Sequence, residues 1–361
     1  MIALTALILA LPAAAPTPLQ DVLQLIDGQS IACEVLTPGF DTVECRVEGE
    51  RTTFEGRNVL EIEFGGMPDD LQRAEGFLAA QEFQNAANLF QAAGQAEGRA
   101  VLPAYAGLRH AEALLAWARF DSGRAKDAAN AFQTWLATYP DHIHLVRARL
   151  GRARATALSG ATDDAARQLE ELASFAFEKN LGKHIEFQAR LDRCHAYLSG
   201  NQAQVAEARL RDLVPEIQRV AGSPDTPPIL RPRLRALLGE GQIALGDALA
   251  AKGGPGAARA YWEGLLRDRS VGSDAQAAAS IGLATAARAE GKSREAQMVL
   301  ARVIATVPAG PEVMARALFQ LGEVCEELGD LPAAGAVYYR ELVANHPNST
   351  WAIRARKKLG G

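Results

Sequence analysis

The sequence lacks a marked excess of either charge. It holds 38 Lys and Arg against 43 Asp and Glu, a formal net charge of −5, and it contains no long block of one sign. Proteins that bind nucleic acid in general are basic, because they neutralise phosphates. The composition therefore argues against nucleic acid as a partner.

Long apolar runs are missing as well. The segment from Met1 to Leu11 is apolar, but it is too short to cross a bilayer, which takes about 20 residues in a helix. Small residues follow it, from Pro12 to Ala15, so that residues 1–15 resemble a secretory signal peptide. The alternative is a buried apolar strand or helix. We expect no integral membrane span and a periplasmic or secreted protein.

Signatures of common enzymes and metal sites are missing too. The sequence has no Gly-rich phosphate loop, no nucleophile elbow and no His-Glu-x-x-His helix. His142 and His144 stand two residues apart, so they would not share one face of a helix, and no further ligands at zinc spacing are nearby. The sequence therefore predicts a protein that is not an enzyme and that holds no metal and no cofactor.

What the sequence does contain is a repeated pair of helical patterns. The pair is clearest in residues 315–347, where a turn at Gly329 separates two stretches with small and large apolar residues three or four apart. These residues are Leu318, Leu321, Gly322 and Cys325 before the turn and Ala334, Tyr338 and Leu342 after it. Pro347 ends the second helix. The small residues suit a close approach of two helices, and Tyr338 would fill the space beside them.

The same arrangement, a turn followed by Ala and then a large apolar residue, recurs seven times. The turn anchors are Gln81, Gly123, Gly160, Gly200, Gly253, Gly291 and Gly329, and the last three are 38 residues apart. This pattern resembles the tetratricopeptide (TPR) repeat, which has a period of about 34 residues. The resemblance implies a mainly α protein, a right-handed α-solenoid of TPR-like helix pairs.

A different pattern precedes the repeats. Residues 19–66 alternate apolar and polar residues in about five short stretches that are separated by turns. This segment resembles a small SH3-like barrel of Sm-like texture, although the residues that bind RNA in Sm-like proteins cannot be placed in it. We expect a small β-barrel-like module that acts as an adaptor or caps the first helix of the array. Gly65 to Pro68 would be the hinge between the two parts.

The rest of the chain divides into four segments. We expect TPR-like repeats 1–4 over residues 67–220, a Pro-rich insertion over 221–233, repeats 5–7 over 234–347 and a capping helix over 348–361. Four prolines in the insertion exclude a helix interior there. The last helix has one apolar face and basic residues elsewhere, as the final helix of a repeat array requires.

Two cysteines fall in the expected β module. Cys33 and Cys45 have matching positions on neighbouring predicted strands, and if the turn lies midway between them they face one another and could form a disulfide in an oxidising compartment. The alternative is two buried free thiols. Cys194 and Cys325 lie on helices of distant repeats, so we expect them to be free and buried.

The closing segment, YRELVANHPNSTWAIRARKKL, is similar to the ends of bacterial envelope TPR proteins. These are the Tol-Pal-associated periplasmic cell-division coordinators and the outer-membrane assembly lipoproteins, although the lipid-anchor Cys of the latter is missing here. The resemblance implies a non-enzymatic protein–protein interaction scaffold in the bacterial cell envelope, with envelope proteins or peptides as partners. The alternative is an exported module that binds a glycan or another small molecule.

In TPR arrays the first helix of each pair lines the concave surface, so its inward positions are candidate partner-binding residues. In the first half these positions are His110, Trp117, Phe120, Arg147, Arg154, Phe187, Arg190 and Tyr197. In the second half they are Glu240, Asp247, Glu323 and Glu326. Aromatic and Arg side chains are common anchors in interfaces, so a peptide with acidic and apolar residues would suit the first half. The alternative is that Trp117 and Tyr197 pack within the array.

Export predicts a processed amino terminus. Mass spectrometry of the protein from its native cells should find a terminus between Ala14 and Leu19, because signal peptides are removed after small residues. An intact Met1 in the cytosolic fraction would contradict this expectation.

Overall fold

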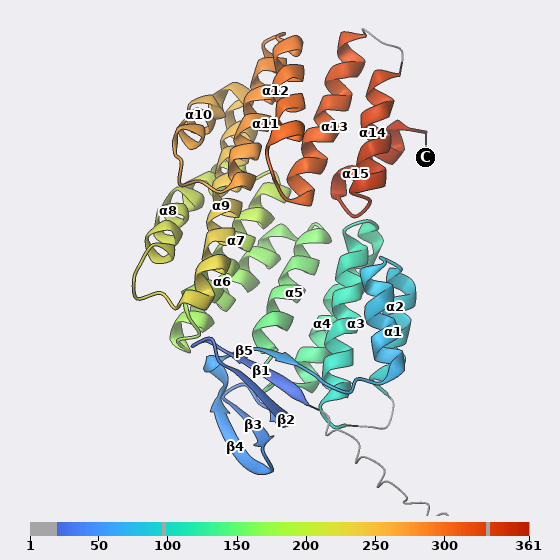
Figure 1. The fold of residues 1–361 in the computed structure, drawn as a ribbon, viewed down its shortest axis with the longest axis vertical. Coiled ribbons are helices and arrows are strands. Elements are labelled where there is room, and N and C mark those ends of the chain that lie inside the picture. Colours follow the sequence, from blue (N-terminus) through green and yellow to red (C-terminus); the bar gives the residue numbers. More distant parts are fainter. Residues whose placement is uncertain (1–19, 96–98, 330–332, 361) are drawn as a thin grey trace, which may run out of the picture.

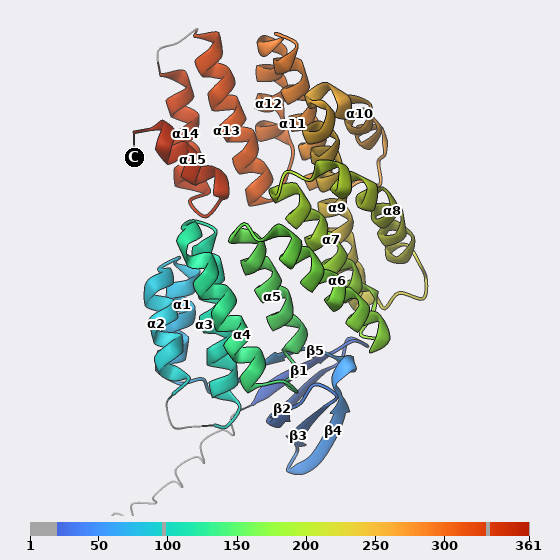
Figure 2. The ribbon, with the colours of Figure 1, turned by 180° about the vertical axis from the view of Figure 1, so that it is seen from behind.

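The computed structural model describes residues 20–95, 99–329 and 333–360. Its helices follow one another along an arc, and a small sheet lies at one end of them (Figure 1, Figure 2). The segment expected to be a signal peptide, residues 1–15, lies outside the described residues. In the part that is described, no helix is long and apolar enough to span a membrane.

The helices form seven successive pairs that are followed by a single helix. The pairs are α1 (Asp69–Ala79) with α2 (Phe83–Ala93), α3 (Leu102–Ala118) with α4 (Ala125–Thr138), α5 (Leu145–Leu158) with α6 (Thr162–Glu178), α7 (Lys183–Ser199) with α8 (Ala203–Ala221), α9 (Arg231–Gly253) with α10 (Arg259–Arg267), α11 (Ser273–Ala289) with α12 (Ser293–Thr306) and α13 (Pro311–Leu328) with α14 (Ala334–Asn345), and α15 (Thr350–Lys358) follows them. Each of the seven turn anchors falls at the turn inside one pair. The predicted α-solenoid of TPR-like helix pairs is therefore confirmed.

The turns explain why Gly is so frequent at the anchors. Gly160, Gly291 and Gly329 have φ angles of 87°, 80° and 64°. This left-handed region is the one that Gly adopts at least cost. At these three anchors the Gly in the sequence is thus a backbone requirement.

Close helix approach explains the glycines inside the helices. A Cβ atom on Gly322 of α13 would lie 2.5 Å from the ring of Tyr339, and one on Gly151 of α5 would lie 2.3 Å from the ring of Phe132. Tyr339 is fully buried, whereas Tyr338, which the sequence predicted for this place, is only partly buried. The predicted pairing of a small residue with a large ring is correct, but in the last pair the ring belongs to the next residue.

The amino-terminal module is a five-stranded antiparallel sheet. Its elements are β1 (Asp21–Leu25), β2 (Ser30–Pro38), β3 (Thr42–Val47), β4 (Glu50–Glu55), a 3-10 turn (Gly56–Asn58) and β5 (Val59–Glu63), and the strand order is β4-β3-β2-β1-β5. One face carries the buried residues Leu23, Val35 and Val43. Buried residues alternate with more exposed ones along β1 and β3, which explains why the sequence predicted strands here.

The structure does not contain the predicted disulfide. All four cysteines are free and buried, which confirms the expectation for Cys194 and Cys325. Val35 rather than Cys33 lies opposite Cys45, because the hairpin turn lies further along the chain and a bulge between Val35 and Thr37 shifts the register. Burial raises the pKa of both thiols, so neither is a ready nucleophile.

A buried ion pair fixes the sheet to the helices. The carboxylate of Asp21, which is fully buried, accepts hydrogen bonds of 2.8 Å from the backbone N–H groups of Val35 and Gly65. It also pairs with the guanidinium of Arg99, which donates to the Gly65 carbonyl at 2.9 Å. The chain is therefore held at Gly65, where the sequence predicted a hinge.

Two further contacts hold the other side of the sheet. In the turn after β2, the N–H of Phe40 donates to the Asp141 carbonyl at 2.6 Å, and the N–H of Ile143 donates to the Pro38 carbonyl at 2.8 Å. Leu60 of β5 packs against the apolar cluster that α7, α8 and α9 share. The sheet thus contacts the connection between α4 and α5 as well as the fourth and fifth helix pairs.

The Pro-rich segment connects α8 to α9. Pro228 begins a short 3-10 turn and Pro232 stands in the first turn of α9, a place where Pro is tolerated. One apolar cluster extends from Leu191 of α7 through Leu213 of α8 to Leu237 of α9. The helix packing therefore continues across this segment.

Candidate functional site

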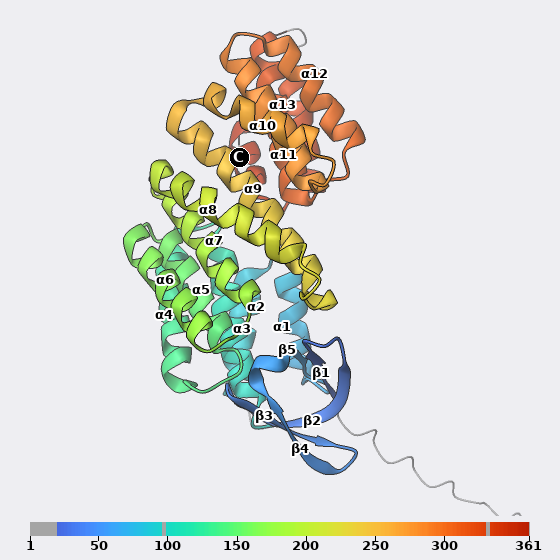
Figure 3. The same ribbon diagram turned by 90° about the vertical axis from the view of Figure 1, so that its left-hand side faces the viewer.

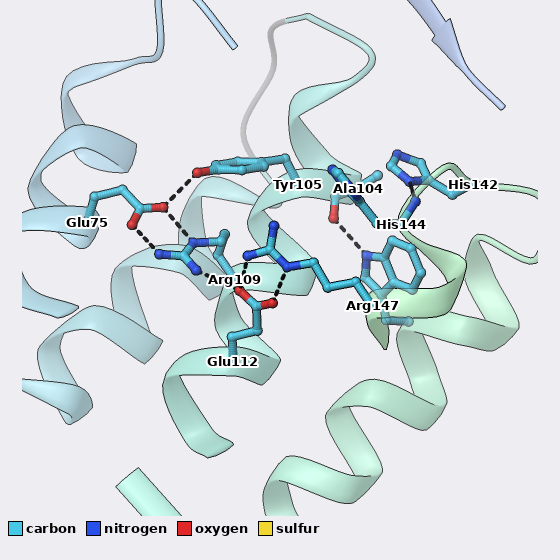
Figure 4. Close-up of polar contacts among 9 residues, drawn as sticks. Glu75, Ala104, Tyr105, Arg109, Glu112, His142, His144 and Arg147 are labelled. Atoms are coloured by element: carbon cyan, nitrogen blue, oxygen red, sulfur yellow. Dashed lines mark hydrogen bonds and ion pairs between the residues drawn. The ribbon is translucent and has the colours of Figure 1, made fainter. Parts of the chain in front are cut away.

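The first helices of the pairs form an inner face, and ion pairs connect neighbouring helices along it. Arg109 of α3 pairs with Glu75 of α1 and, 2.6 Å away, with Glu112 of its own helix. Arg147 of α5 donates two hydrogen bonds to the same Glu112 (Figure 4). These contacts hold α1, α3 and α5 in register. The pairs Arg154–Asp192, Asp247–Arg316 and Arg288–Glu323 continue the pattern as far as α13.

The Glu75 carboxylate is the centre of one of these contacts. It accepts hydrogen bonds of 2.7 Å from the Tyr105 hydroxyl and from Nε of Arg109. Burial alone would raise the pKa of Glu75, but these hydrogen bonds and the charge of Arg109 outweigh it and the pKa is lowered. Glu75 is thus charged at neutral pH, and its bonds to Tyr105 and Arg109 hold α1 against α3 at the inner face.

A hollow of about 410 Å³ opens where the inner face meets the sheet, and we call it the module hollow. The first turns of α5, α7 and α9 form one side, and β5 with the turn after β2 forms the other. Figure 3 shows the sheet beyond the ends of the helices rather than beside them. The apolar lining includes Phe40, Leu60, Ile62, Ile143, Leu150 and Ile185.

Arginine predominates among the charged residues of the module hollow. Its lining includes Arg57, Arg147, Arg154 and Arg233 but only two acidic residues, Glu61 and Glu112. The first three arginines have carboxylate partners, which are Glu55, Glu112 and Asp192. Within the described residues, Arg233 has no carboxylate within ion-pair distance. The hollow therefore has both polar and apolar walls, with a cationic corner at the start of α9.

Two buried histidines also line the module hollow. His144 is 9% exposed and His184 is 3% exposed, and each has a ring nitrogen without a hydrogen-bond partner in the described part of the chain. Burial lowers the pKa of His144 to about 3, with the charges of His142 and Arg147 adding to the effect. Burial, and then the charge of Arg233, lowers the pKa of His184 to about 4. Both rings are therefore neutral at physiological pH.

A second hollow, of about 470 Å³, lies at the other end of α3, and we call it the turn hollow. Its lining includes Gln81 at the turn after α1 and the stacked rings of Phe83 and Phe120, whose centroids are 5.3 Å apart. It shares Glu112, Leu115 and Arg147 with the module hollow. The two hollows therefore adjoin along α3 and α5, and we call them together the inner groove.

The carboxyl-terminal end of the chain also reaches this groove. Asn348, from the connection between α14 and α15, lines the turn hollow together with residues of the first three helices. The arc of helices brings α15 back above α3 and α4 (Figure 1). The groove is thus bordered by the last repeat at one end and by the sheet at the other.

Three of the eight sequence-predicted site residues line the groove. Arg147 and Arg154 line the module hollow, and Phe120 lines the turn hollow. Both arginines are paired with carboxylates rather than free.

The other five lie elsewhere. Nδ1 of His110 lies 2.9 Å from the Ala87 carbonyl of α2, and the guanidinium of Arg124 covers Trp117. Phe187 is fully buried, Tyr197 packs against the same cluster, and Arg190 pairs with Glu186 and Glu216. The spacing from the turns predicted inward positions on α3 and α7 that are about one residue away from the observed ones. The inward positions are Arg109, Glu112 and Arg119 on α3, and Gln188 and Asp192 on α7.

The predicted acidic second half of the inner face is largely neutralised. Asp247 pairs with Arg316 at 2.9 Å, Glu323 with Arg288 at 2.8 Å and Glu326 with Lys358 at 2.8 Å. Burial raises the pKa of Glu240. The carboxylates there are part of the packing between helices.

The residues that sequence reasoning missed are Arg233 and the contributions of the sheet. Arg233 lies inside the segment that was set aside as a Pro-rich insertion, and Leu60 and Ile62 lie in a module that was treated as separate. A signal was present for Arg233, since the Pro at residue 232 marks a helix start and places the next residues in its first turn.

The fold and the groove place the protein in the class of TPR-like α-solenoids, and two solved structures resemble it. The first is the apo form of the quorum sensor NprR from B. thuringiensis, with a TM-score of 0.45 and 13% identity over 76% of this chain and 75% of that chain. The second is NprR in complex with its cognate peptide NprX, with a TM-score of 0.45 and 13% identity over 76% and 77%. No family model and no curated protein matches the sequence. Both likenesses are distant and say nothing about the function of this chain.

The buried histidines predict that acid weakens the fold. The pKa of His184 is about 4 in the folded protein against about 6.5 in an unfolded chain. The unfolded chain therefore binds more protons between these values, and stability falls as the pH drops through this window. We expect a loss of about 1–2 kcal/mol from His184 alone between pH 7 and pH 5.

Urea unfolding midpoints at pH 7 and pH 5 measure this loss. The drop should be smaller for His184→Gln than for the wild type, and unchanged for His195→Gln, whose side chain is exposed. An equal drop in His184→Gln and the wild type would show that His184 is not buried in its neutral form.

Proposed function

We propose that this protein is a non-enzymatic binding scaffold that takes an extended peptide segment of another protein into the inner groove. The observation that carries the proposal is the inner groove, which consists of two adjoining hollows of several hundred Å³ along α3 and α5. Concave, largely apolar sites with a few charged groups are typical of binding sites. The bonds among Arg109, Glu112 and Arg147 hold the groove in shape before a ligand arrives.

The dimensions of the groove suit a short extended segment. It follows α3, which has 17 residues, and a helix of that size is about 25 Å long. An extended chain advances about 3.4 Å per residue, so about seven residues would fill this length. A folded domain would not fit between the last repeat at one end and the sheet at the other.

The charges of the groove favour an acidic and apolar segment. Arg119 and Arg233 have no carboxylate partner within the described residues, whereas the carboxylate of Glu112 is already bound to two arginines. Apolar surface is offered by Leu150 and Ile185 in one hollow and by Phe83 in the other. A peptide that carries acidic residues between apolar ones would complement both features.

A second candidate is an exported module that binds a glycan or another small molecule. The volume of the module hollow, about 410 Å³, favours this candidate, because small-molecule sites usually have volumes of about 300–1,000 Å³. In that case the hollow would be occupied without the rest of the groove.

We further propose a setting in the bacterial cell envelope, in the periplasm or outside the cell. The support is the signal-like segment and the similarity of the closing segment to envelope TPR proteins. In this setting the five-stranded sheet would be an SH3-like adaptor that closes one end of the groove. The processed amino terminus described above is the measurement that tests the setting.

Filling the module hollow should abolish peptide binding. Leu150→Trp places a large ring in the hollow, and Leu158→Trp is the matched control, because Leu158 is on the same helix, is 41% exposed and does not line the groove. The probe is an equimolar library of random heptapeptides passed over the immobilised full-length protein. We expect the retention of bound peptides to fall at least about tenfold in Leu150→Trp and to stay unchanged in Leu158→Trp.

Circular dichroism establishes that each variant is folded, and Arg154→Glu provides a second test if Leu150→Trp is not. Equal retention by the wild type and by folded groove variants would contradict the proposal. If the wild type retains no peptide, but cell-wall fragments raise its melting temperature and Leu150→Trp removes the shift, then the small-molecule candidate is correct.

A further inference from the structure

We infer that the module hollow is the end of the groove and holds the terminal carboxylate of the bound peptide, with the last apolar side chain beside it. This inference rests on the proposed peptide-binding function and adds the direction and chemistry of binding. It depends on three features of the hollow: a wall across the groove, a cationic corner without a partner, and an apolar lining beside that corner.

The wall is made by the sheet. A chain that enters at the turn hollow and follows α3 and α5 meets β5 and the ring of Phe40 at the far end. Phe40 is held in place, because its N–H donates to the Asp141 carbonyl at 2.6 Å and its ring lies 5.5 Å from that of Phe175. Since the wall is fixed to the array, the bound chain ends there rather than passing through.

The cationic corner is formed by Arg233 and its neighbours. Arg154 already has Asp192 as a partner at 2.6 Å, while Arg233 has only Glu61 nearby, beyond ion-pair distance. Arg233 is exposed at the mouth of the hollow, and its pKa is lowered by partial loss of water around it and by the charge of Arg154, while Glu61 opposes the effect. A carboxylate between the two guanidinium groups would relieve their repulsion.

The surroundings of the corner also favour an anion. His144 and His184 are more than nine-tenths buried, line the hollow and each have a ring nitrogen without a partner in the described residues. A neutral imidazole donates from only one ring nitrogen, and a ring that turned its N–H toward the hollow could donate to a ligand oxygen. The starts of α5, α7 and α9 point at the same place, and helix N-termini favour negative charge.

The apolar lining accounts for the last side chain. Leu60 comes from the sheet, Ile143 from the connection before α5 and Ile185 from α7, so three separate elements surround the space beside Arg233. Burying a side chain of the size of Leu there removes apolar surface from water on both partners. The preferred ligand end is therefore an apolar residue with a free carboxylate.

Two peptide libraries test the inference on the full-length protein. Both have six random residues followed by Leu, and one ends in a carboxylate while the other ends in a carboxamide. We expect the immobilised wild type to retain the carboxylate library at least about tenfold better, because a charge-assisted contact with Arg233 is lost in the amide. Arg233→Gln should lower retention of the carboxylate library to the level of the amide library.

The matched control is Arg235→Gln, because Arg235 is exposed on the same helix and does not line the groove, and it should behave as the wild type. The comparison of the two libraries on the wild type needs no variant, so it decides the question even if Arg233→Gln does not fold. A third library, amidated and with Glu before the last Leu, distinguishes a chain end from an acidic side chain.

Each other outcome overturns a defined part of the account. Equal retention of carboxylate and amide libraries, with both lost in Leu150→Trp, would leave the peptide groove standing and refute the terminal carboxylate. Equal retention of the third library and the carboxylate library would assign the corner to an acidic side chain. If no library is retained, but dodecanoate binds the wild type and not Leu150→Trp, the hollow takes a small apolar acid and the peptide-binding function fails as well.

Discussion

The buried ion pair between Asp21 and Arg99 is the contact on which the arrangement of the groove depends. The Asp21 carboxylate has no exposed surface, and it accepts two backbone N–H groups as well as the guanidinium of Arg99. Breaking a buried pair by removing one partner typically costs about 3–5 kcal/mol, because it leaves a buried charge uncompensated. Without this contact only the bonds of Pro38 and Phe40 and the packing of Leu60 would hold the sheet against the helices. The sheet would then no longer be fixed as the wall that closes the groove.

Ion pairs also hold the rest of the inner face, although they are less buried than the pair between Asp21 and Arg99. Carboxylates and guanidinium groups from neighbouring first helices are paired, so that the groove is rigid and most of its charges are satisfied. Arg233 is an exception, and it stands at the one place where helix starts, buried histidines and an apolar lining meet. Arg233 is exposed and has no carboxylate partner within the described residues, so its guanidinium is available to a ligand, which is why we assign it to the ligand rather than to the fold.

The sequence predicted the parts of the fold that local chemistry determines. Turns such as those at Gly160 and Gly291 need a left-handed residue, and Gly322 must lie against a ring, so these features repeat with the helix pairs. The predictions that failed depend on contacts between distant segments. The inner face of α3 was placed one residue out of register because α2 and α4 decide its rotation. Of the two alternatives that the sequence left open for Cys33 and Cys45, the structure has the free thiols, and the bulge that shifts their register is not visible in an alternating pattern. Pro232 signals that Arg233 lies in the first turn of a helix, but the place of Arg233 in the hollow depends on neighbours from β5, α5 and α7, which the sequence does not bring beside it.

Amide hydrogen exchange of the complex tests the central claim most directly. The N–H groups in the first turn of a helix have no partner within the helix, so those at the starts of α5, α7 and α9 that have no other partner exchange quickly unless something covers them. The N–H groups of Leu145 and Ile185 are exceptions, because they donate to the carbonyls of His142 and Gly182. On addition of the most strongly retained carboxylate heptapeptide, the account predicts slower exchange in these three first turns and in β5. Slower exchange confined to the second helices α8, α10 and α12, with no change in the three first turns, would contradict it.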